Sequence, residues 1–352
     1  MSELMLSVHD IVVDYPGHPP LRAVDSVSFD IHAGEVVGLV GESGCGKSTM
    51  AKVITGLLAP NAGEVVYRGR TLKPLGLGGR AKDSTGIQMV FQDPGSSLNP
   101  RRRIGPQIQD GLDAARRRLG TVGSGRTPSH TTGSVPGTTG SVPSARGFVP
   151  SVNGSVPGEP GPVTRTDGSV PSATESSLSA TRSVLDTTAS PLSGDTSRPT
   201  TVAQWLERVG MSASDATRFP RSFSGGQRQR IATARALAAA PDILVADEPI
   251  SSLDASTQAL VAYIMSSLTI AEGAGMLFIS HDLSVVRLIA DRLLVMYKGR
   301  IVERGRAEEV WADPRHPYTQ ALLKAIPLPD GARKLPHVTP PGTDYPLEEA
   351  VR

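Results

Sequence analysis

Hydrophobic and polar residues alternate in two segments near the start of the chain. The alternation covers LMLSVHDIVVDY (residues 4–15) and AVDSVSFDI (23–31), and a period of two is typical of half-buried strands. A continuous apolar run in EVVGLVG (35–41) predicts a buried strand, and GEVVYRGR (63–70) predicts a short strand and a turn. Residues 47–58 have helical spacing, which places these side chains on one face: Met50, Val53, Ile54, Leu57 and Leu58.

Helical and strand patterns alternate in the second half of the chain, after an ordered segment that begins at 202–210. Helices are predicted over 225–240, where Pro241 ends the pattern, and over 256–272 and 283–292. Buried strands are predicted over 242–247 and 276–280, and a hairpin over 293–305 that turns at Lys298–Arg300. This alternation predicts an α/β fold with a mainly parallel sheet, to which the strand-rich N-terminal part adds an antiparallel β portion.

Between about residues 120 and 200 the hydrophobic pattern disappears. Ser, Thr, Gly and Pro dominate this stretch, and the phrase GSVP recurs within it. Too little apolar surface is available to offset the entropy of ordering, about 1–2 kcal/mol per residue, so we expect a disordered insertion. The proline-rich segment from Pro327 onward predicts a loosely held tail.

Composition narrows the class of protein. The 352 residues carry a formal net charge of +2, which gives no reason to expect a nucleic-acid partner. The single cysteine, Cys45, permits no internal disulfide and no cysteine-based metal cluster. No apolar stretch reaches the ~20 residues that span a bilayer, and the first residues lack the pattern of a signal peptide. We therefore expect any role at a membrane to depend on partner proteins.

A phosphate-binding motif follows the apolar strand at 35–41. GESGCGKST matches G-x-x-x-x-G-K-[ST], and it stands between a strand and a helix, the context that this motif requires. Backbone N–H groups of such a loop surround phosphate oxygens at the positive end of a helix. Lys47 would reach the β- and γ-phosphates, and Ser48 would bind Mg²⁺. The predicted nucleotide-binding residues here are Gly41, Ser43, Gly44, Cys45, Gly46, Lys47, Ser48 and Thr49.

Two carboxylates end the apolar strand in ILVADEP (243–249). Phosphoryl transfer needs a residue that holds Mg²⁺ and a residue that activates the attacking water, and Asp247 and Glu248 suit these two roles. Acidic residues at strand ends also occur in ordinary solvated loops. The phosphate-binding loop elsewhere in the same chain favours the functional interpretation.

A third motif opens the helix about twenty residues before this acidic strand. In SFSGGQRQR, Ser224 can cap the helix, and Gly225 and Gly226 leave backbone N–H groups exposed at its positive end. A capped helix with a flexible start has the same appearance. With the two other motifs around it, Ser224–Gln227 is instead predicted to bind a phosphate.

Together these motifs resemble the ATP-binding subunit of an ABC transporter, over nearly all of the chain outside residues 120–200. FSGGQ is similar to the signature of that family, with Phe223 where Leu is commoner. SSLD (251–254) resembles its D-loop with Asp254, and ISHD its switch histidine, His281. Gln92 in VFQDP resembles the Q-loop glutamine, and Tyr15 resembles the aromatic residue that stacks on adenine.

The resemblance implies a mechanism with ATP and Mg²⁺ as cofactors. Two such domains meet head to tail, so that Ser224–Gln227 of one act on the ATP that the other binds. Glu248 serves as general base, His281 contacts the γ-phosphate, and Gln92 contacts the metal, the attacking water and the membrane partner. Catalytic roles therefore fall to Glu248, His281 and Gln92, and Mg²⁺ ligation to Ser48, Gln92 and Asp247.

Two further stretches resemble the dipeptide, oligopeptide and nickel importer branch: FQDPGSSLNPRRRIG (91–105) and HPYTQALLKAIP (316–327). Some relatives carry a cysteine cluster after the second motif, and because this region has no Cys we expect no iron–sulfur cluster. The resemblance implies two membrane permeases, a second ABC ATPase that is identical or related, and indirectly a substrate-binding protein. It also implies a peripheral location on the cytoplasmic face of the membrane.

The expected organisation has four parts. Residues 1–92 and 223–304 form the ATPase core, 93–222 a helical subdomain that contains the insertion, and 305–352 a C-terminal extension. Three alternatives remain open at this point: a soluble ABC protein without a transport role, an exporter subunit, and a nucleotide-binding partner that has lost catalysis. The substrate also remains open among dipeptides, oligopeptides and nickel.

Overall fold

The computed structural model describes residues 2–73, 86–93, 97–122, 198–325 and 344–349. The GSVP repeats, and the expectation that they are disordered, lie outside these residues. At the edges of that expected insertion, however, the chain is placed. Helix α3 (Ile104–Val122) continues past Gly120, and Arg198 donates a hydrogen bond of 2.9 Å to the Leu237 carbonyl oxygen.

A four-stranded antiparallel sheet is built mostly from the N-terminal part of the chain, in the order β2-β1-β4-β5. The alternating pattern of the sequence produces it, because one face of each long strand is buried and the other is partly exposed. Its strands are β1 (Leu4–Tyr15), β2 (Leu21–His32), β4 (Ala62–Tyr67) and β5 (Arg70–Thr71).

The second sheet has six strands in the order β10-β9-β3-β8-β7-β6. The strands from β9 to β6 run parallel, and only the β9–β10 hairpin is antiparallel, turning at Lys298–Gly299. The mainly parallel sheet and the antiparallel β portion expected from the sequence are both confirmed. The strands are β3 (Val36–Val40), β6 (Ile87–Val90), β7 (Ile243–Asp247), β8 (Gly275–Ser280), β9 (Arg292–Tyr297) and β10 (Arg300–Arg306).

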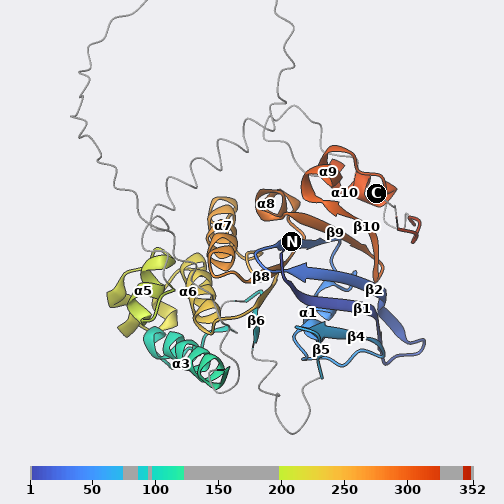
Figure 1. The fold of residues 1–352 in the computed structure, drawn as a ribbon. Coiled ribbons are helices and arrows are strands. Elements are labelled where there is room, and N and C mark those ends of the chain that lie inside the picture. Colours follow the sequence, from blue (N-terminus) through green and yellow to red (C-terminus); the bar gives the residue numbers. More distant parts are fainter. Residues whose placement is uncertain (1, 74–85, 94–96, 123–197, 326–343, 350–352) are drawn as a thin grey trace, which may run out of the picture.

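Both faces of the parallel sheet are covered, as the short and continuously apolar central strands require. Val37 and Leu39 of β3 enter one core with α1 (Lys47–Ile54) and the antiparallel sheet. Val36 and Val40 enter the other core, on the face that the following helices cover. These helices are α6 (Gly225–Ala238), α7 (Ala255–Ala271) and α8 (Leu283–Ile289) (Figure 1).

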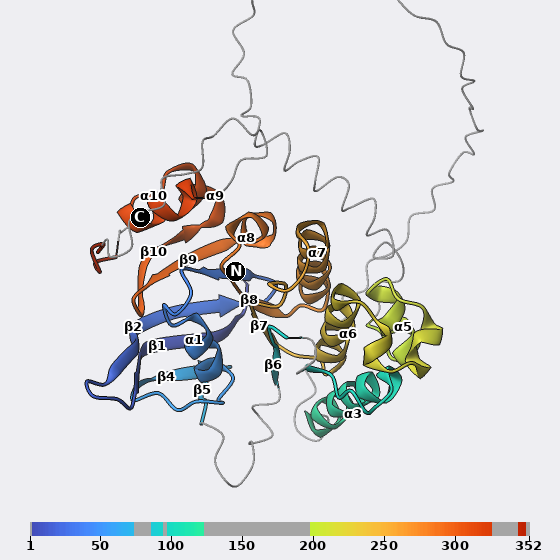
Figure 2. The same ribbon diagram turned by 180° about the vertical axis from the view of Figure 1, so that it is seen from behind.

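Helices α3 and α5 (Val202–Arg208) lie beyond α6, on the side of the molecule away from the antiparallel sheet (Figure 2). Two short 3-10 turns, Ala213–Thr217 and Pro220–Ser222, connect α5 to α6. At the opposite side, α9 (Ala307–Ala312) and α10 (Pro317–Lys324) pack beside β9 and β10. Within the described ranges, no helix combines the length and apolar character that crossing a bilayer requires.

Three expectations about local structure are wrong in part. Two concern the ends of helices, and the third concerns the tail. Helix α1 ends at Ile54 rather than continuing to Leu58, since Gly56 turns the backbone with a φ of 72°, and Leu57 is 50% exposed. Helix α6 ends at Ala238, and Ala240, not Pro241 alone, breaks it with a φ of 57°.

The tail is not loosely held where it is described. Residues 344–349 return to the core, because Tyr345 packs against Tyr297 and Tyr318 and because Asp344 pairs with Lys298. The expectation for 327–343 falls outside the described residues.

Candidate active site

The predicted catalytic residues follow four neighbouring parallel strands, at the edge where these strands end. The phosphate-binding loop (Gly41–Thr49) follows β3, Gln92 follows β6, Glu248 follows β7 and His281 follows β8. The register aligns the strand ends, with Val40 opposite Ser280, Ile279 opposite Asp247, and Ala246 opposite Val90. In open α/β sheets, ligands bind outside the carboxyl ends of the strands, so the fold brings these residues to the expected place.

Glycine is required at two positions of the phosphate-binding loop. Gly41 has a φ of 153°, and a Cβ atom there would lie 2.1 Å from the Met296 carbonyl oxygen. Gly46 has a φ of 112°, and its Cβ would lie 2.2 Å from the Ala23 carbonyl oxygen. Any side chain would push the loop off the backbones of β9 and β2, so these glycines set the shape of the loop.

Lys47 is held inside the loop that precedes it. Its side chain is almost fully buried, at 3% exposure. The Nζ atom donates hydrogen bonds to the carbonyl oxygens of Gly41 at 2.8 Å and Glu42 at 2.7 Å. Burial also raises the pKa of the neighbouring Cys45 thiol, which stays protonated. A phosphate at this loop would therefore meet a preplaced positive charge at the start of α1.

Ser48 and Asp247 form the oxygen-rich part of the site. The Ser48 hydroxyl donates a hydrogen bond of 2.9 Å to Asp247 Oδ1. Burial raises the pKa of Asp247, and the hydrogen bond from Ser48 opposes that shift only in part. An alcohol oxygen beside a carboxylate is the kind of ligand pair that Mg²⁺ prefers, and a cation would relieve the cost of the buried charge. The residues present therefore fit a bound Mg²⁺.

Glu248 and His281 face each other beside this pair. Glu248 Oε2 lies 3.3 Å from Nδ1 of His281. Glu248 has a φ of 46°, a conformation that is uncommon for residues other than glycine, and its N–H donates a 2.9 Å hydrogen bond to the Ile279 carbonyl oxygen. Strained backbone of this kind is concentrated at functional sites, where the surrounding structure holds it in place.

The two remaining single-residue predictions lie at the borders of the site. Tyr15 is half-buried at the end of β1, and its hydroxyl is 3.3 Å from Thr49 Oγ1, so the structure brings it beside the phosphate-binding loop. Gln92 is exposed, two residues beyond the end of β6. Its position opposite the Asp247–Glu248 end of β7 follows from the strand register.

The signature residues form a separate cluster with the D-loop. The Gln227 N–H donates to Ser224 Oγ at 3.3 Å, and the Ser224 N–H donates to Gln227 Oε1 at 3.0 Å, which is a capping box at the start of α6. Asp254 caps α7 nearby by accepting a hydrogen bond from Thr257 N. In the described part of the chain, none of the hydrogen bonds of Ser224–Gln227 reaches Gly41–Thr49.

Close packing explains the second glycine of the signature. A Cβ atom on Gly226 would lie 2.5 Å from Cγ2 of Thr257. Helices α6 and α7 therefore approach each other closely at the start of α6, where Gly226 is buried. The sequence singled out Gly226 for its backbone, but it contains no signal that pairs this residue with Thr257.

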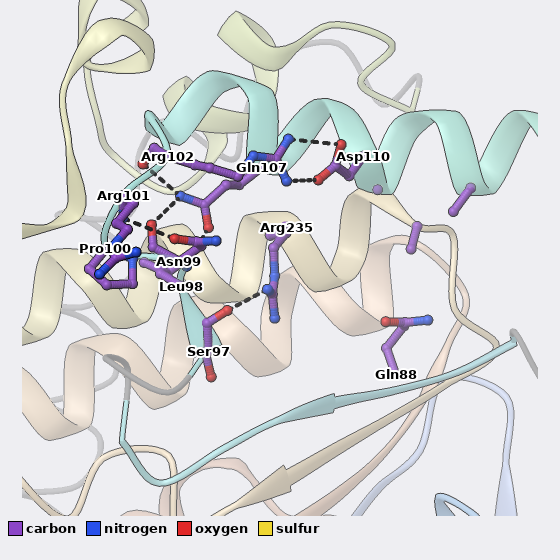
Figure 3. Close-up of a pocket in the computed structure, with 13 residues that line it drawn as sticks. Gln88, Ser97, Leu98, Asn99, Pro100, Arg101, Arg102, Gln107, Asp110 and Arg235 are labelled. Atoms are coloured by element: carbon purple, nitrogen blue, oxygen red, sulfur yellow. Dashed lines mark hydrogen bonds and ion pairs between the residues drawn. The ribbon is translucent and has the colours of Figure 1, made fainter. Parts of the chain in front are cut away.

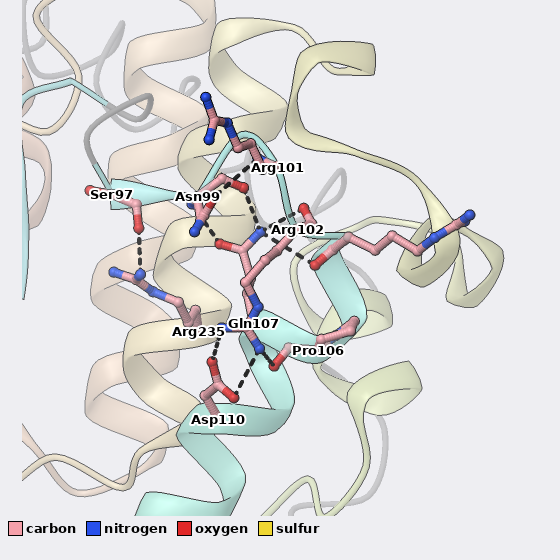
Figure 4. Close-up of polar contacts among 9 residues, drawn as sticks. Ser97, Asn99, Arg101, Arg102, Pro106, Gln107, Asp110 and Arg235 are labelled. Atoms are coloured by element: carbon pink, nitrogen blue, oxygen red, sulfur yellow. Dashed lines mark hydrogen bonds and ion pairs between the residues drawn. The ribbon is translucent and has the colours of Figure 1, made fainter.

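The motifs did not predict a cavity of about 650 Å³ that borders the helices α3 and α6. It lies between β6, the segment 97–102, α3 and α6, and it is open to solvent (Figure 3). Gln107 organises one wall: its Oε1 accepts a hydrogen bond of 2.8 Å from Asn99 N, and its Nε2 donates to Asn99 O at 3.1 Å (Figure 4). The segment 91–105 resembled an importer branch as a stretch, and apart from Gln92 none of its residues had a predicted role.

Charged side chains line the same cavity. Arg102 pairs with Asp110 of α3, and Arg235 of α6 donates to the Ser97 carbonyl oxygen (Figure 4). Burial lowers the pKa of Arg235, although not enough to remove its charge at neutral pH. The cavity therefore presents a partly buried cation beside the segment that leads from Gln92 into α3.

Two family models match the chain, one over most of its length up to residue 251 and the other over its C-terminal part. The model described as "ABC transporter" matches residues 24–251, and "Oligopeptide/dipeptide transporter, C-terminal region" matches residues 302–351. The oligopeptide transport ATP-binding protein OppF of Bacillus subtilis (strain 168) is 38% identical over 313 residues, which are 88% of this chain and 78% of the relative.

A second relative and a solved structure agree with these matches. The oligopeptide transport ATP-binding protein OppF of Streptococcus mutans is 36% identical over 310 residues, 88% of this chain and 77% of the relative. The dimeric ATP-binding cassette MJ0796, in a post-hydrolysis state bound to ADP and Pi, has a TM-score of 0.53 at 21% identity and covers 86% of this chain and 99% of its own. At that identity the likeness concerns the fold alone, and it confirms the expected ATPase fold.

Proposed function

This chain belongs to the ABC transporter family, and we propose that it is the ATP-hydrolysing subunit that energises import of peptides through partner membrane permeases. The observation that carries the proposal is a site at one edge of the sheet, where Ser48 pairs with Asp247 and Glu248 pairs with His281. The same chain matches the C-terminal region of oligopeptide and dipeptide transporters. That region and the names of the relatives favour peptides over nickel as the substrate class.

Within one subunit, the loop Gly41–Thr49 and the Lys47 ammonium bind the phosphates of ATP, and Tyr15 stacks on the adenine. Ser48, Asp247 and Gln92 hold Mg²⁺, which would neutralise charge on the phosphates. Glu248 accepts a proton from the attacking water. The hydrogen-bonding distance from His281 to Glu248 supports a role for this histidine in orienting the base while it contacts the γ-phosphate.

The second half of each ATP site comes from another ABC ATPase, identical or related. The start of α6 supports this assignment. Ser224, Gly225 and Gly226 lie at this helix N-terminus, where a phosphate can bind, and in the described part of the chain they form no hydrogen bond to the Gly41–Thr49 loop. Asp254 lies in the same cluster and belongs to the same interface. A head-to-tail pair would place each signature against the ATP of the partner subunit.

The cavity between β6, the segment 97–102, α3 and α6 receives a segment of a permease. It borders α3 and α6, so an occupant there would contact both the helical side of the molecule and the segment that follows Gln92. The partly buried Arg235 guanidinium favours an occupant that presents carboxylate or carbonyl oxygens. Movement of the permease would thereby reach the catalytic edge of the sheet through β6.

The rest of the organisation follows from this assignment. Residues 1–92 and 223–304 act as the ATPase core, 93–222 as the helical subdomain and 305–352 as a C-terminal extension. The subunit works at the cytoplasmic face of the membrane with two permeases, and a substrate-binding protein delivers peptide to those permeases rather than to this chain. No iron–sulfur cluster takes part.

Uptake measurements test the proposal. Cells that carry the intact protein should take up labelled peptides, and Glu248→Gln should abolish that uptake while the subunit still binds its permeases. Undiminished uptake of every transported substrate by Glu248→Gln would overturn the role of Glu248, and a preference for Ni²⁺ would overturn the peptide assignment. Purification with ribosomes or DNA, instead of two permeases, would favour a soluble ABC protein without a transport role.

A paired substitution tests the permease cavity. Ala114→Trp would fill the cavity from α3, and it should stop uptake while leaving ATP hydrolysis by the isolated subunit intact. Leu119→Trp, on the same helix but exposed and outside the cavity lining, is the matched control and should transport normally. Equal transport by the two variants would argue against permease docking at this place.

A further inference from the structure

The C-terminal extension makes direct contact with the phosphate-binding loop. The Glu42 N–H donates a hydrogen bond of 2.9 Å to the Tyr318 hydroxyl oxygen. Tyr318 belongs to α10 and is almost fully buried, at 1% exposure. The contact therefore joins residues 276 positions apart, and its acceptor ring is shielded from solvent although Glu42 is exposed.

The same peptide group also holds Lys47. The Glu42 N–H and the Gly41 carbonyl are the two polar ends of one peptide unit, and that carbonyl accepts a hydrogen bond of 2.8 Å from Lys47 Nζ. Tyr318 thus fixes one end of a rigid planar group whose other end binds the lysine of the loop. A rotation of this peptide would break both hydrogen bonds together.

His316 and Glu303 fix the start of α10, and with it Tyr318. The Tyr318 N–H donates to His316 Nδ1 at 3.1 Å, so the ring hydrogen is on Nε2, which lies 3.0 Å from the Pro346 carbonyl oxygen. The buried Glu303 carboxylate accepts hydrogen bonds from the N–H groups of Arg315 and His316. The helix start is therefore tied both to β10 and to the tail.

Three aromatic rings complete the connection between the tail and the loop. The Tyr297 and Tyr318 ring centroids are 4.4 Å apart, and Tyr345 meets Tyr297 at 5.6 Å and Tyr318 at 5.5 Å in edge-on geometry. Asp344 pairs with Lys298, and Glu349 pairs with Arg304. The tail 344–349 thus packs, through Tyr345, on the ring that contacts the phosphate-binding loop.

We propose that Tyr318 is a positioning residue for the phosphate-binding loop, acting through the Glu42 peptide on Lys47, and that the tail 344–349 holds Tyr318 in place. This inference rests on the proposed ATPase function and deepens it. It gives the C-terminal extension a role in nucleotide affinity that is separate from any role in substrate or partner choice.

Two matched hydroxyl deletions test the proposal in the full-length protein. Tyr318→Phe keeps the ring and its packing but leaves the Glu42 N–H without its acceptor, so KM and Kd for ATP should rise about tenfold while kcat changes less than about twofold. Tyr345→Phe removes a hydroxyl from the same cluster and should leave all three constants within about twofold. A merely structural role would lower the melting temperature without this split between KM and kcat.

A third variant tests the tail, and it keeps the proposal testable if Tyr318→Phe does not fold. Tyr345→Ala keeps the Tyr318 hydroxyl but removes the ring that packs against it, and KM for ATP should rise about threefold. Wild-type constants in both Tyr318→Phe and Tyr345→Ala would overturn the proposal. Equal changes in Tyr318→Phe and Tyr345→Phe would do the same, since they would indicate general loosening.

Amide hydrogen exchange separates this inference from the ATPase function. Exchange at Glu42 should be about tenfold faster in Tyr318→Phe than in the wild type and unchanged in Tyr345→Phe, in the absence of any nucleotide. Unchanged exchange would overturn the positioning contact even if the protein hydrolyses ATP. If exchange is faster in Tyr318→Phe but the wild-type protein binds no ATP, the proposed function is refuted. The effect on ATP affinity is then refuted with it.

Discussion

The Ser48 hydroxyl and the Asp247 carboxylate are joined by a hydrogen bond of 2.9 Å, although 199 positions separate the two residues. The bond connects the start of α1 to the end of β7 and closes the oxygen-rich part of the site. The bond is partly buried, and burial of Asp247 raises the pKa of its carboxyl group. The charged carboxylate is therefore held at a cost in stability, which a cation at the site would offset.

Asp247→Asn should make the protein without nucleotide more resistant to heat, by a few degrees at neutral pH. Asn keeps an oxygen that accepts the Ser48 hydrogen bond but removes the buried charge. Because the folded pKa of Asp247 is above its unfolded value, the folded chain binds more protons between those two values. Wild-type stability should thus fall as the pH rises through that interval.

Thermal unfolding at several pH values measures this difference. The advantage of Asp247→Asn should be complete above the folded pKa of Asp247 and should vanish below its unfolded pKa. The same variant should lose the ability of Mg²⁺ to tighten ATP binding. A pH-independent advantage, or a variant that still responds to Mg²⁺, would contradict the assignment of Asp247.

Glu248→Gln should lower kcat for ATP hydrolysis about a hundredfold or more, because glutamine cannot accept a proton from the attacking water. Its KM for ATP should stay within about threefold, since the phosphate-binding loop is untouched. Steady-state hydrolysis by the purified protein gives both constants. Glu308→Gln, which makes the same change in the exposed first turn of α9, is the control and should behave as the wild type.

Gly226→Ala should destabilise the fold by about 1–3 kcal/mol, because the new methyl would lie 2.5 Å from Cγ2 of Thr257. Thr257→Ser removes that methyl, so the double variant should recover most of the lost stability. Denaturant unfolding of the single and double variants measures the coupling. Gly120→Ala, where no atom lies within 4 Å, should cause no loss. Additive effects of the two substitutions would show that the helices do not meet in this way.

Replacing residues 123–197 by a Gly/Ser linker of about ten residues should preserve both folding and ATP hydrolysis. Arg118, before the replaced segment, pairs with Asp242 at 2.8 Å, and Arg198, after it, lies 3.4 Å from Glu272. Arg198 also donates a hydrogen bond to the Leu237 carbonyl oxygen near the end of α6, and Asp242 directly precedes β7, so both ends of the segment contact the connection between α6 and β7.

Hydrolysis and the unfolding midpoint of this deletion variant should match those of the intact chain. A collapse of hydrolysis with normal folding would show that the segment takes part in ATP chemistry. Loss of peptide uptake alone would instead indicate contact with the membrane partners.

Local sequence patterns determined many of the strands, several helices and the motifs of the site. The period-two segments became β1 and β2, and the apolar runs became β3, β7 and β8, because burial of one or both strand faces is visible in the order of residues. The contiguous motifs at 41–49, 224–227 and 247–248 could be recognised for the same reason. Each combines in one short stretch the groups that phosphate chemistry needs.

Only the tertiary structure decided which of these stretches touch. The pairing of Ser48 with Asp247 and of Glu248 with His281 depends on strand order and register, which no local period encodes. The close approach of Gly226 to Thr257, and the return of residues 344–349 onto the Tyr297 and Tyr318 rings, depend on helix packing and on ion pairs between distant residues.

The contact between Glu42 and Tyr318 shows the same division. The sequence by itself determined a phosphate-binding loop and, far from it, a C-terminal motif (316–327) with no residue-level role. The fold placed the Tyr318 hydroxyl of the C-terminal motif against the Glu42 backbone of the loop, because α10 packs on the β9–β10 hairpin beside the end of β3. Periodicity and spacing describe which groups a segment offers, whereas the partner of each group is decided by how the segments pack in three dimensions.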